Sequence, residues 1–171
     1  MVKLEIERRF LVKSDFAEYN LPKLLKFEKY TICQIYLNKP EGFKGSRRIR
    51  HAWQENKTSQ FYFTEKTPTK SLITKIEKER EISKKEYQVL LKKADPQRDT
   101  ILKHRLYFIW KNQKFELDFF LEPKRITSLV ILEIELQDPK QKVTLPDFLP
   151  IMTEITNSPD LSNSNLSKRP T

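Results

Sequence analysis

The stretch that decides the fold is Leu4-Glu5-Ile6-Glu7-Arg8-Arg9-Phe10, close to the start of the chain. Successive side chains of a β-strand point to opposite faces, so an extended backbone sorts alternating residues into two sets. In this run Glu5, Glu7 and Arg9 share one face. The residues of the other face are apolar: Leu4, Ile6 and Phe10. The apolar face predicts packing against a core, and the charged face borders either solvent or a polar cavity.

The chain has 171 residues, of which 37% are hydrophobic, and this composition is enough for one globular domain. We expect a single domain over residues 1–156, followed by a tail over 157–171 that is rich in Ser, Asn and Pro and packs on or caps the domain. No apolar run approaches the roughly 18 residues of a membrane span, and the first ten residues lack the apolar core of a secretory signal. A cytoplasmic protein is therefore expected. The single cysteine, Cys33, excludes an internal disulfide.

The net charge is +10, from 33 Lys and Arg against 23 Asp and Glu, which favours an anionic partner. Nucleic acid, a nucleotide or polyphosphate would each satisfy this balance. A Lys-rich solvated surface has the same net charge, so the position of the charges decides what they mean.

Alternating or β-rich runs predict about eight strands. Their ranges are 1–13, 30–38, 45–55, 59–67, 74–83, 101–110, 113–121 and 128–137. Two helices are predicted over 15–27 and 84–94, with Ser14 and Ser83 as their N-caps, and Pro146 is predicted to open a third, short helix.

The charges of these strands fall on one face of each strand, opposite an apolar face. Beyond the first strand the charged-face residues are Arg48, Arg50, Thr64, Lys66, Glu77, Glu79, Glu81, Lys103, Arg105, Glu116, Asp118, Glu133 and Glu135. One interpretation is an antiparallel sheet with a wet side. However, acidic strands here alternate with basic ones, and clustered carboxylates repel one another unless cations compensate them.

The second interpretation closes the strands into a barrel with the charged faces inward, which creates a water-filled lumen. Such a lumen suits an extended polyanion. Lys and Arg would neutralise phosphate oxygens, while carboxylates are hard ligands for Mg²⁺ or Mn²⁺, and phosphoryl transfer uses that combination.

The ordered set of these residues resembles the CYTH family, the triphosphate tunnel metalloenzymes, in its short bacterial form. The run Glu5-Ile6-Glu7-Arg8-Arg9 is similar to the family's Glu-x-Glu-x-Lys signature. Further similar elements follow in order along most of the chain: Gln34-Ile35-Tyr36-Leu37, Arg48-Ile49-Arg50, Thr64-Glu65-Lys66, Glu77 with Glu79 and Glu81, Lys103-His104-Arg105, Glu116-Leu117-Asp118, Glu133-Ile134-Glu135 and Glu154-Ile155-Thr156.

The resemblance implies a mainly β fold, an eight-stranded antiparallel β-barrel tunnel with a few flanking helices. It implies metal-dependent hydrolysis of a triphosphate, either inorganic tripolyphosphate or a nucleoside triphosphate. The residues that would hold Mg²⁺ or Mn²⁺ are Glu5, Glu7 and Glu135, with Asp118 and Glu133 in support. The residues that would bind phosphate are Arg9, Arg48, Arg50, Lys66, Lys103 and Arg105. The residues given a catalytic role are Glu5, Glu7, Arg9 and Glu79, and Glu77 or Glu79 would hold bases, bind a second metal or orient water.

Three positions depart from the family pattern: Arg9, Ile35 and, as a softer change, Lys75, the basic residue that precedes the Glu-rich strand. Arg9 replaces the lysine of the signature, and an arginine stays charged and cannot accept a proton. Ile35 replaces the glycine of the second element. Two other functions stay open: a class IV adenylate cyclase, and a non-catalytic module that binds polyphosphate or RNA. A small triphosphate is favoured as partner over nucleic acid, with no membrane partner, and a homodimer is left open.

Overall fold

The computed structural model describes residues 2–71 and 74–170, and it is mainly β. Its strands are β1 (Val2–Val12), β2 (Phe27–Tyr36), β3 (Ser46–Trp53), β4 (Gln60–Pro68), β5 (Thr74–Glu81), β6 (Ile101–Trp110), β7 (Gln113–Glu122), β8 (Val130–Glu135) and β9 (Ile151–Glu154). The α-helices of the described part are α1 (Lys84–Leu91) and α2 (Asn163–Leu166), and the 3₁₀ turns are η1 (Glu18–Asn20), η2 (Lys124–Ile126) and η3 (Pro159–Leu161). None of these helices has the length and hydropathy needed to cross a membrane.

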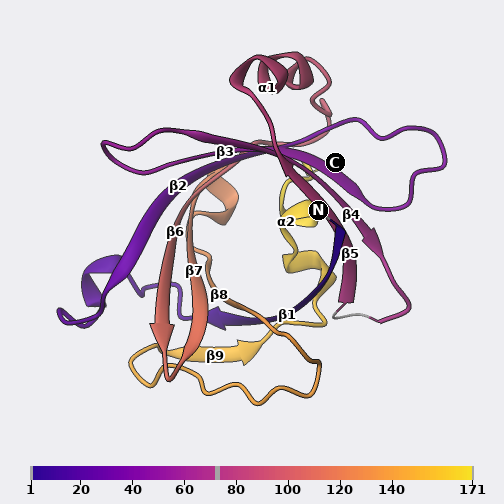
Figure 1. The fold of residues 1–171 in the computed structure, drawn as a ribbon. Helices are drawn as coiled ribbons and strands as arrows, with labels where there is room; N and C mark the ends of the chain where they lie inside the picture. Colours follow the sequence, from indigo (N-terminus) through magenta and orange to yellow (C-terminus); the bar gives the residue numbers. More distant parts are fainter. Residues whose placement is uncertain (1, 72–73, 171) are drawn as a thin grey trace.

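Eight antiparallel strands close into a barrel, which confirms the predicted fold. Their order is β5-β4-β3-β2-β6-β7-β8-β1, and the pairing of β1 with β5 closes the ring. Strand β1 makes the closure possible because it is long: Val2–Ile6 pair with β5, and Glu7–Val12 pair with β8. The ninth strand, β9, which the sequence did not predict, pairs with β1 at Phe10–Val12. Figure 1 views the ring of strands with α1 outside it and α2 within its outline.

Most of the apolar core lies outside the barrel. The outward faces of β1, β6, β7 and β8 carry residues such as Phe10, Leu106, Leu117 and Leu132, all at most 2% exposed. The segments that precede β2 and β9 cover these faces, and they contribute further members of the same cluster, Phe16, Leu21 and Leu149. Helix α1 covers the outward faces of β3 and β4 through Tyr87 and Leu90. With the apolar faces packed outward, alternation turns the charged faces into the barrel.

Two turns keep neighbouring strands tightly connected. Lys111 and Asn112 both have positive φ between β6 and β7, as the two-residue hairpins that match strand twist require. Gly45 has φ of +144° before β3, and an added Cβ would lie 2.1 Å from the carbonyl oxygen of Lys66. Only glycine lets the two strands approach at this point.

Two helix predictions are wrong. The helix predicted over 15–27 is reduced to η1, and β2 already begins at Phe27. Pro22 explains this, because it removes a backbone donor from the predicted helix interior and forces Leu21 into extended geometry, with ψ of 146°. The helix predicted from Pro146 is absent as well: the only helix-like bond there joins the Leu149 N–H to the Pro146 carbonyl, and Pro150 follows at once.

The helix after Ser83 is confirmed, with an earlier end. The Ser83 hydroxyl accepts a hydrogen bond from the Glu86 N–H, as an N-cap does. The helix ends at Leu91 and not at Ala94, because the last turn tightens into a bond from the Ala94 N–H to the Leu91 carbonyl. Ala94 then bridges to Leu37, which ties the end of the helix to the strand region after β2.

Candidate functional site

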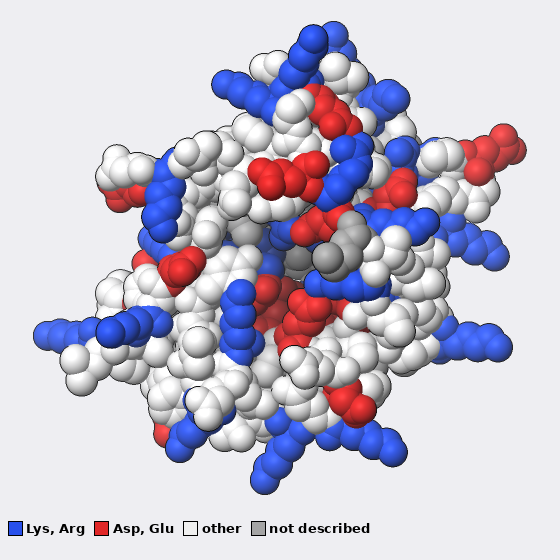
Figure 2. All heavy atoms as spheres, viewed as in Figure 1, with Lys and Arg blue, Asp and Glu red and all other residues white. Residues whose placement is uncertain are grey.

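The inward faces of the barrel line one cavity of ≈1540 Å³. Of the residues predicted to form the site, those that line it are Glu5, Glu7, Arg9, Arg48, Arg50, Lys66, Glu79, Lys103, Arg105, Glu133 and Glu135. Asp118 is the exception, because it is 0% exposed and lies behind the bases that do line the cavity. Figure 2 shows Lys and Arg side chains meeting Asp and Glu side chains around a hollow in this face of the molecule.

One wall of the cavity pairs carboxylates with lysines. Glu5 lies 2.5 and 2.6 Å from Nζ of Lys66, and the same ammonium group is 3.1 Å from Glu77. Burial and the charge of Arg48 act against protonated Lys66, but Glu5 and its acidic neighbours outweigh both and raise the pKa of Lys66. This lysine is therefore a permanent cation inside the barrel.

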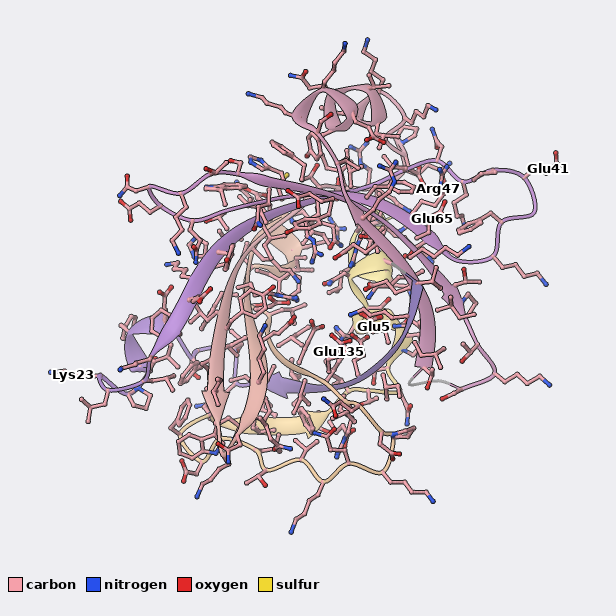
Figure 3. All side chains as sticks on the ribbon, viewed as in Figure 1. Glu5, Lys23, Glu41, Arg47, Glu65 and Glu135 are labelled. Atoms are coloured by element: carbon pink, nitrogen blue, oxygen red, sulfur yellow. The ribbon has the colours of Figure 1, made fainter. Side chains whose placement is uncertain are left out.

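The same pattern continues toward β8. Nζ of Lys75 lies 3.1 Å from Glu7, and Nζ of Lys3 lies 2.8 Å from Glu135. Glu7 and Glu135 are direct partners across the β1–β8 pair. Lys3 was not predicted to belong to the site, although the alternation that places Glu5 and Glu7 inside the barrel places Lys3 there too. Figure 3 shows Glu5 and Glu135 inside the ring of strands.

A second network joins β6, β7 and β8. Arg105 holds Asp118 with two bonds of 2.6 Å, donates to Glu133 at 2.8 Å and also contacts Glu116. Burial acts against the charge of Arg105, yet Asp118 and Glu116 raise its pKa well above the ordinary value of an arginine. Lys103 lies 2.5 Å from Asp118 and is 1% exposed. Burial, reinforced by Arg105, lowers the pKa of Lys103 to about 8.

The basic wall opposite is formed by β3. Nη2 of Arg50 donates to Glu79 at 2.7 Å, and the same Glu79 oxygen accepts from the Thr64 hydroxyl at 2.7 Å. Burial disfavours the Glu79 carboxylate, but Arg50 and Thr64 overcome this and lower its pKa. Nη2 of Arg48 is 3.8 Å from Glu77. Glu77 and Glu79 thus hold the bases of neighbouring strands in place.

Two donors of this wall have no partner. Within the described residues, the Nε atoms of Arg48 and Arg50 are buried and make no hydrogen bond. A buried N–H without an acceptor costs about 1–3 kcal/mol, so an acceptor is expected where these donors point. Both arginines line the cavity, and their side chains would have to reorient for an anion bound there to accept from these two atoms.

The acidic residues of β1 and β8 have the donor chemistry for a hard cation. Glu7 and Glu135 are cross-strand neighbours, and Glu5 shares their face. Carboxylate oxygens are the ligands that Mg²⁺ and Mn²⁺ prefer. Across residues 2–71 and 74–170, however, no three acidic, imidazole or thiol side chains stand close enough to hold a metal, and each of these three glutamates is paired with a lysine. The predicted supporting ligands, Asp118 and Glu133, belong to the separate network around Arg105.

No protein-family model and no curated protein matches this chain. Solved structures do match. The inorganic triphosphatase NE1496 is 23% identical over 95% of this chain and 93% of its own, with a TM-score of 0.58. HpAC1 from Hippeastrum, described as a putative adenylyl cyclase with a dominant triphosphatase activity, is 17% identical over 80% and 81%, with a TM-score of 0.58.

A third match comes from a different biological setting. The Mediator head module of Schizosaccharomyces pombe is 13% identical over 82% of this chain and 86% of the matched chain, with a TM-score of 0.54. At these identities the likeness shows a shared fold. Because that fold also occurs in the Mediator structure, activity has to be argued from the side chains of the cavity.

The tail contributes residues that the sequence argument did not assign to the site. Ser162, Asn163 and Ser164 line the cavity. Nη2 of Arg9 donates to the carbonyl of Leu161 at 2.6 Å, while its Nε donates to Glu133 at 2.8 Å. The tail was expected to pack on or cap the domain, but its sequence does not indicate which of its residues reach the cavity, because the contact joins residues 152 positions apart.

Proposed function

We propose that this protein hydrolyses a triphosphate with the help of Mg²⁺ or Mn²⁺. The observation that carries the proposal is the group of cations from β3, β4 and β6, among them Arg48, Arg50 and Lys66, in a cavity whose opposite wall is acidic. These cations favour an anion, and the acidic wall favours a cation beside it. A metal triphosphate supplies both charges in one ligand. The solved triphosphatases that share the fold support the same conclusion.

The bases have distinct parts in this proposal. Arg48 and Arg50 bind the phosphate chain from β3, and Lys66 binds it from β4. Lys103 and Arg105 bind it from β6, held by Asp118, Glu116 and Glu133. Arg9 completes the set from β1, because a guanidinium has five N–H donors and the contacts to Glu133 and Leu161 use only two of them.

Ligand binding would exchange the partners of the acidic wall. Lys3, Lys66 and Lys75 now neutralise Glu135, Glu5 and Glu7. Phosphate oxygens would attract these lysines, and Glu5, Glu7 and Glu135 would then be available to hold the metal. The metal, when bound, neutralises charge on the phosphate oxygens.

The reaction is attack by water on the terminal phosphorus. A bond forms between the water oxygen and phosphorus, the phosphoanhydride bond breaks, and the electron pair leaves on the diphosphate while a proton is released. The fixed cations of β3, β4 and β6 stabilise the charge that develops on the leaving and transferred oxygens. Glu79 contributes by fixing Arg50 and Thr64.

The test measures phosphate release from tripolyphosphate and ATP with Mg²⁺ or Mn²⁺, together with any cyclic nucleotide formed. Glu5→Gln and Glu7→Gln keep the shape of the wall and remove one charge each. Each is expected to lower kcat/KM by about 100-fold, the scale of losing one preorganised electrostatic group.

The matched control is Glu65→Gln. Glu65 pairs with Arg47 at 2.9 Å and lies with it outside the ring (Figure 3), so this variant removes the same charge away from the cavity. Its activity is expected to stay within about twofold, as for a surface substitution far from the site. Equal activity in all three variants would refute the proposal. Tight binding without turnover would replace it by the non-catalytic module, and release of cyclic AMP by the cyclase.

A further inference from the structure

Along several strands, the side chains that line the cavity change from charged to aromatic and, on β6, to aliphatic. On β6 the cavity-lining residues run from Lys103 and Arg105 to Tyr107 and Ile109. A strand rises about 3.3 Å per residue, so each step of two residues on this face covers about 7 Å. The strand thus passes from cations to an aromatic ring and then to an aliphatic side chain that is 68% exposed.

The neighbouring strands repeat this gradient. On β4 the cavity-facing residues run from Lys66 to Tyr62, and on β2 Tyr30 pairs directly with Arg105. The rings of Tyr30 and Tyr107 are in edge-to-face contact, with centroids 5.5 Å apart. Three tyrosines from three strands therefore stand next to the proposed phosphate-binding bases.

These tyrosines adjoin the arginines directly. The guanidinium of Arg50 lies 5.2 Å from the ring centre of Tyr62, and that of Arg105 lies 5.9 Å from the ring centre of Tyr107. Burial raises the pKa of Tyr62 and Tyr107, so both phenols are neutral at pH 7 and do not repel an anion. Farther out, Leu24, Phe27 and Ile109 line the same cavity and are exposed.

The opposite end of the interior differs. Inward-facing apolar residues of β2, β6, β7 and β8 form one cluster there, and the tail adds Leu161 and Leu166 to it. The residues from the strands are Tyr36, Ile101, Phe120 and Ile131. The cluster fills that end of the interior. A group attached to a bound triphosphate would therefore lie at the other end, beside the tyrosines.

We propose that Tyr30, Tyr62 and Tyr107, with Phe27 and Ile109 at the rim, bind a planar aromatic ring carried by the triphosphate. This inference rests on the proposed function. It makes the substrate an organic triphosphate of the nucleoside or thiamine type, in preference to inorganic tripolyphosphate. Stacking on aromatic side chains contributes roughly 1–3 kcal/mol per base, enough for about a tenfold preference.

The experiment compares kcat/KM for ATP, thiamine triphosphate and tripolyphosphate in the wild type and in Tyr107→Leu, and it measures the Kd of each compound by calorimetry. The wild type is expected to prefer at least one organic triphosphate by about tenfold over tripolyphosphate. Tyr107→Leu is expected to reduce that preference by about tenfold, and Tyr107→Phe, which keeps the ring, is expected to restore most of it. The two organic compounds distinguish a nucleobase from a thiamine ring.

The control is Tyr19→Leu, since Tyr19 is 86% exposed and does not line the cavity. It is expected to change neither rates nor affinities. A wild type that prefers tripolyphosphate, or a Tyr107→Leu variant that loses all three substrates equally, would overturn the inference while the triphosphatase proposal stands. If no compound is hydrolysed, the proposed function fails. In that case the aromatic subsite is supported by tighter binding of an organic triphosphate that Tyr107→Leu weakens, and overturned by equal Kd values.

Discussion

At the residue scale, Arg9 connects the start of the chain to its tail. Its guanidinium is 6% exposed and joins Glu133 on β8 to the Leu161 carbonyl, and its backbone N–H donates to the Thr156 hydroxyl at 3.1 Å. A planar fork with several donors can hold a carboxylate and a carbonyl at once, whereas a lysine ammonium is a single point charge. The departure from the resembled signature thus gives the tail an anchor.

We predict that Arg9→Lys lowers the melting temperature by about 5 °C, because one buried charge-assisted bond is lost. Trypsin should also cleave faster after Lys168 if the tail is less firmly held. The control is Arg8→Lys, because Arg8 pairs with Glu154 on the outer surface, where both side chains are about a third exposed or more. Equal melting temperatures in the two variants would contradict an anchoring role for Arg9.

Alternation placed most of the site residues on the correct face, because a barrel wall uses the same period of two that the sequence displays. It could not supply their partners. The pairing of Glu5 with Lys66 depends on β1 closing against β5, and the pairing of Arg105 with Glu133 depends on β8 lying next to β7 in the ring. Such contacts follow from strand order, which local patterns do not encode.

At the element scale, helix caps show where local rules hold. Ser83 and Ser14 both look like N-caps in the sequence, but only Ser83 precedes a helix. The difference lies in the residues that follow each serine, because Pro22 interrupts the segment after Ser14. Tertiary packing then uses the non-helical segment, burying Phe16 and Leu21 against the outer faces of the barrel.

We predict that Ser83→Ala lowers the free energy of unfolding by about 1 kcal/mol, the usual value of an N-cap. Ser14→Ala is the matched control and should change it by less than about 0.5 kcal/mol. Urea denaturation of the two variants gives both numbers. If Ser14→Ala lowered the free energy of unfolding as much as Ser83→Ala does, the hydrogen bond of the Ser83 cap would not be the source of the effect.

At the scale of the whole molecule, the fold encloses two networks of buried ionic groups and places most of its apolar core outside the ring of strands. The closed ring was predicted from the family resemblance, because the charged and apolar faces of seven of the eight predicted strands fit an open sheet as well. The short strand β9 could not be predicted, because its four residues show too little alternation. It pairs with β1 only at Phe10–Val12, where one edge of β1 is free. The enclosed charges also make stability depend on acid.

Burial acts against the Glu133 carboxylate, but Arg105 and Arg9 lower its pKa below the ordinary 4.5. A lowered folded-state pKa means that the unfolded chain binds the proton more readily, so the stabilisation is complete above pH 4.5 and is lost as the pH falls toward the folded value. We predict a steep loss of unfolding free energy between about pH 4.5 and pH 3. Chemical denaturation across this range measures it.

Glu133→Gln should show a flatter dependence over the same range, together with lower stability at pH 7, because two arginines lose a carboxylate partner. Glu154→Gln is the comparison on the surface, where the pair with Arg8 is largely solvated. Its acid dependence should stay close to that of the wild type. Equal slopes in all three proteins would contradict the assignment to Glu133.

The pairing of β1 has a consequence for the order in which the protein can assemble during synthesis. Of the nine strands β1 is synthesised before the others, and it finds its partners in β5, β8 and β9, the last of which ends at Glu154. Hairpins such as β3–β4 and β6–β7 can form as soon as they are made, because their contacts are local. The strand with Glu5 and Glu7 must wait, with its apolar face uncovered, until nearly the whole chain has been translated. Chaperone demand and aggregation should therefore concentrate on nascent chains that end before residue 154.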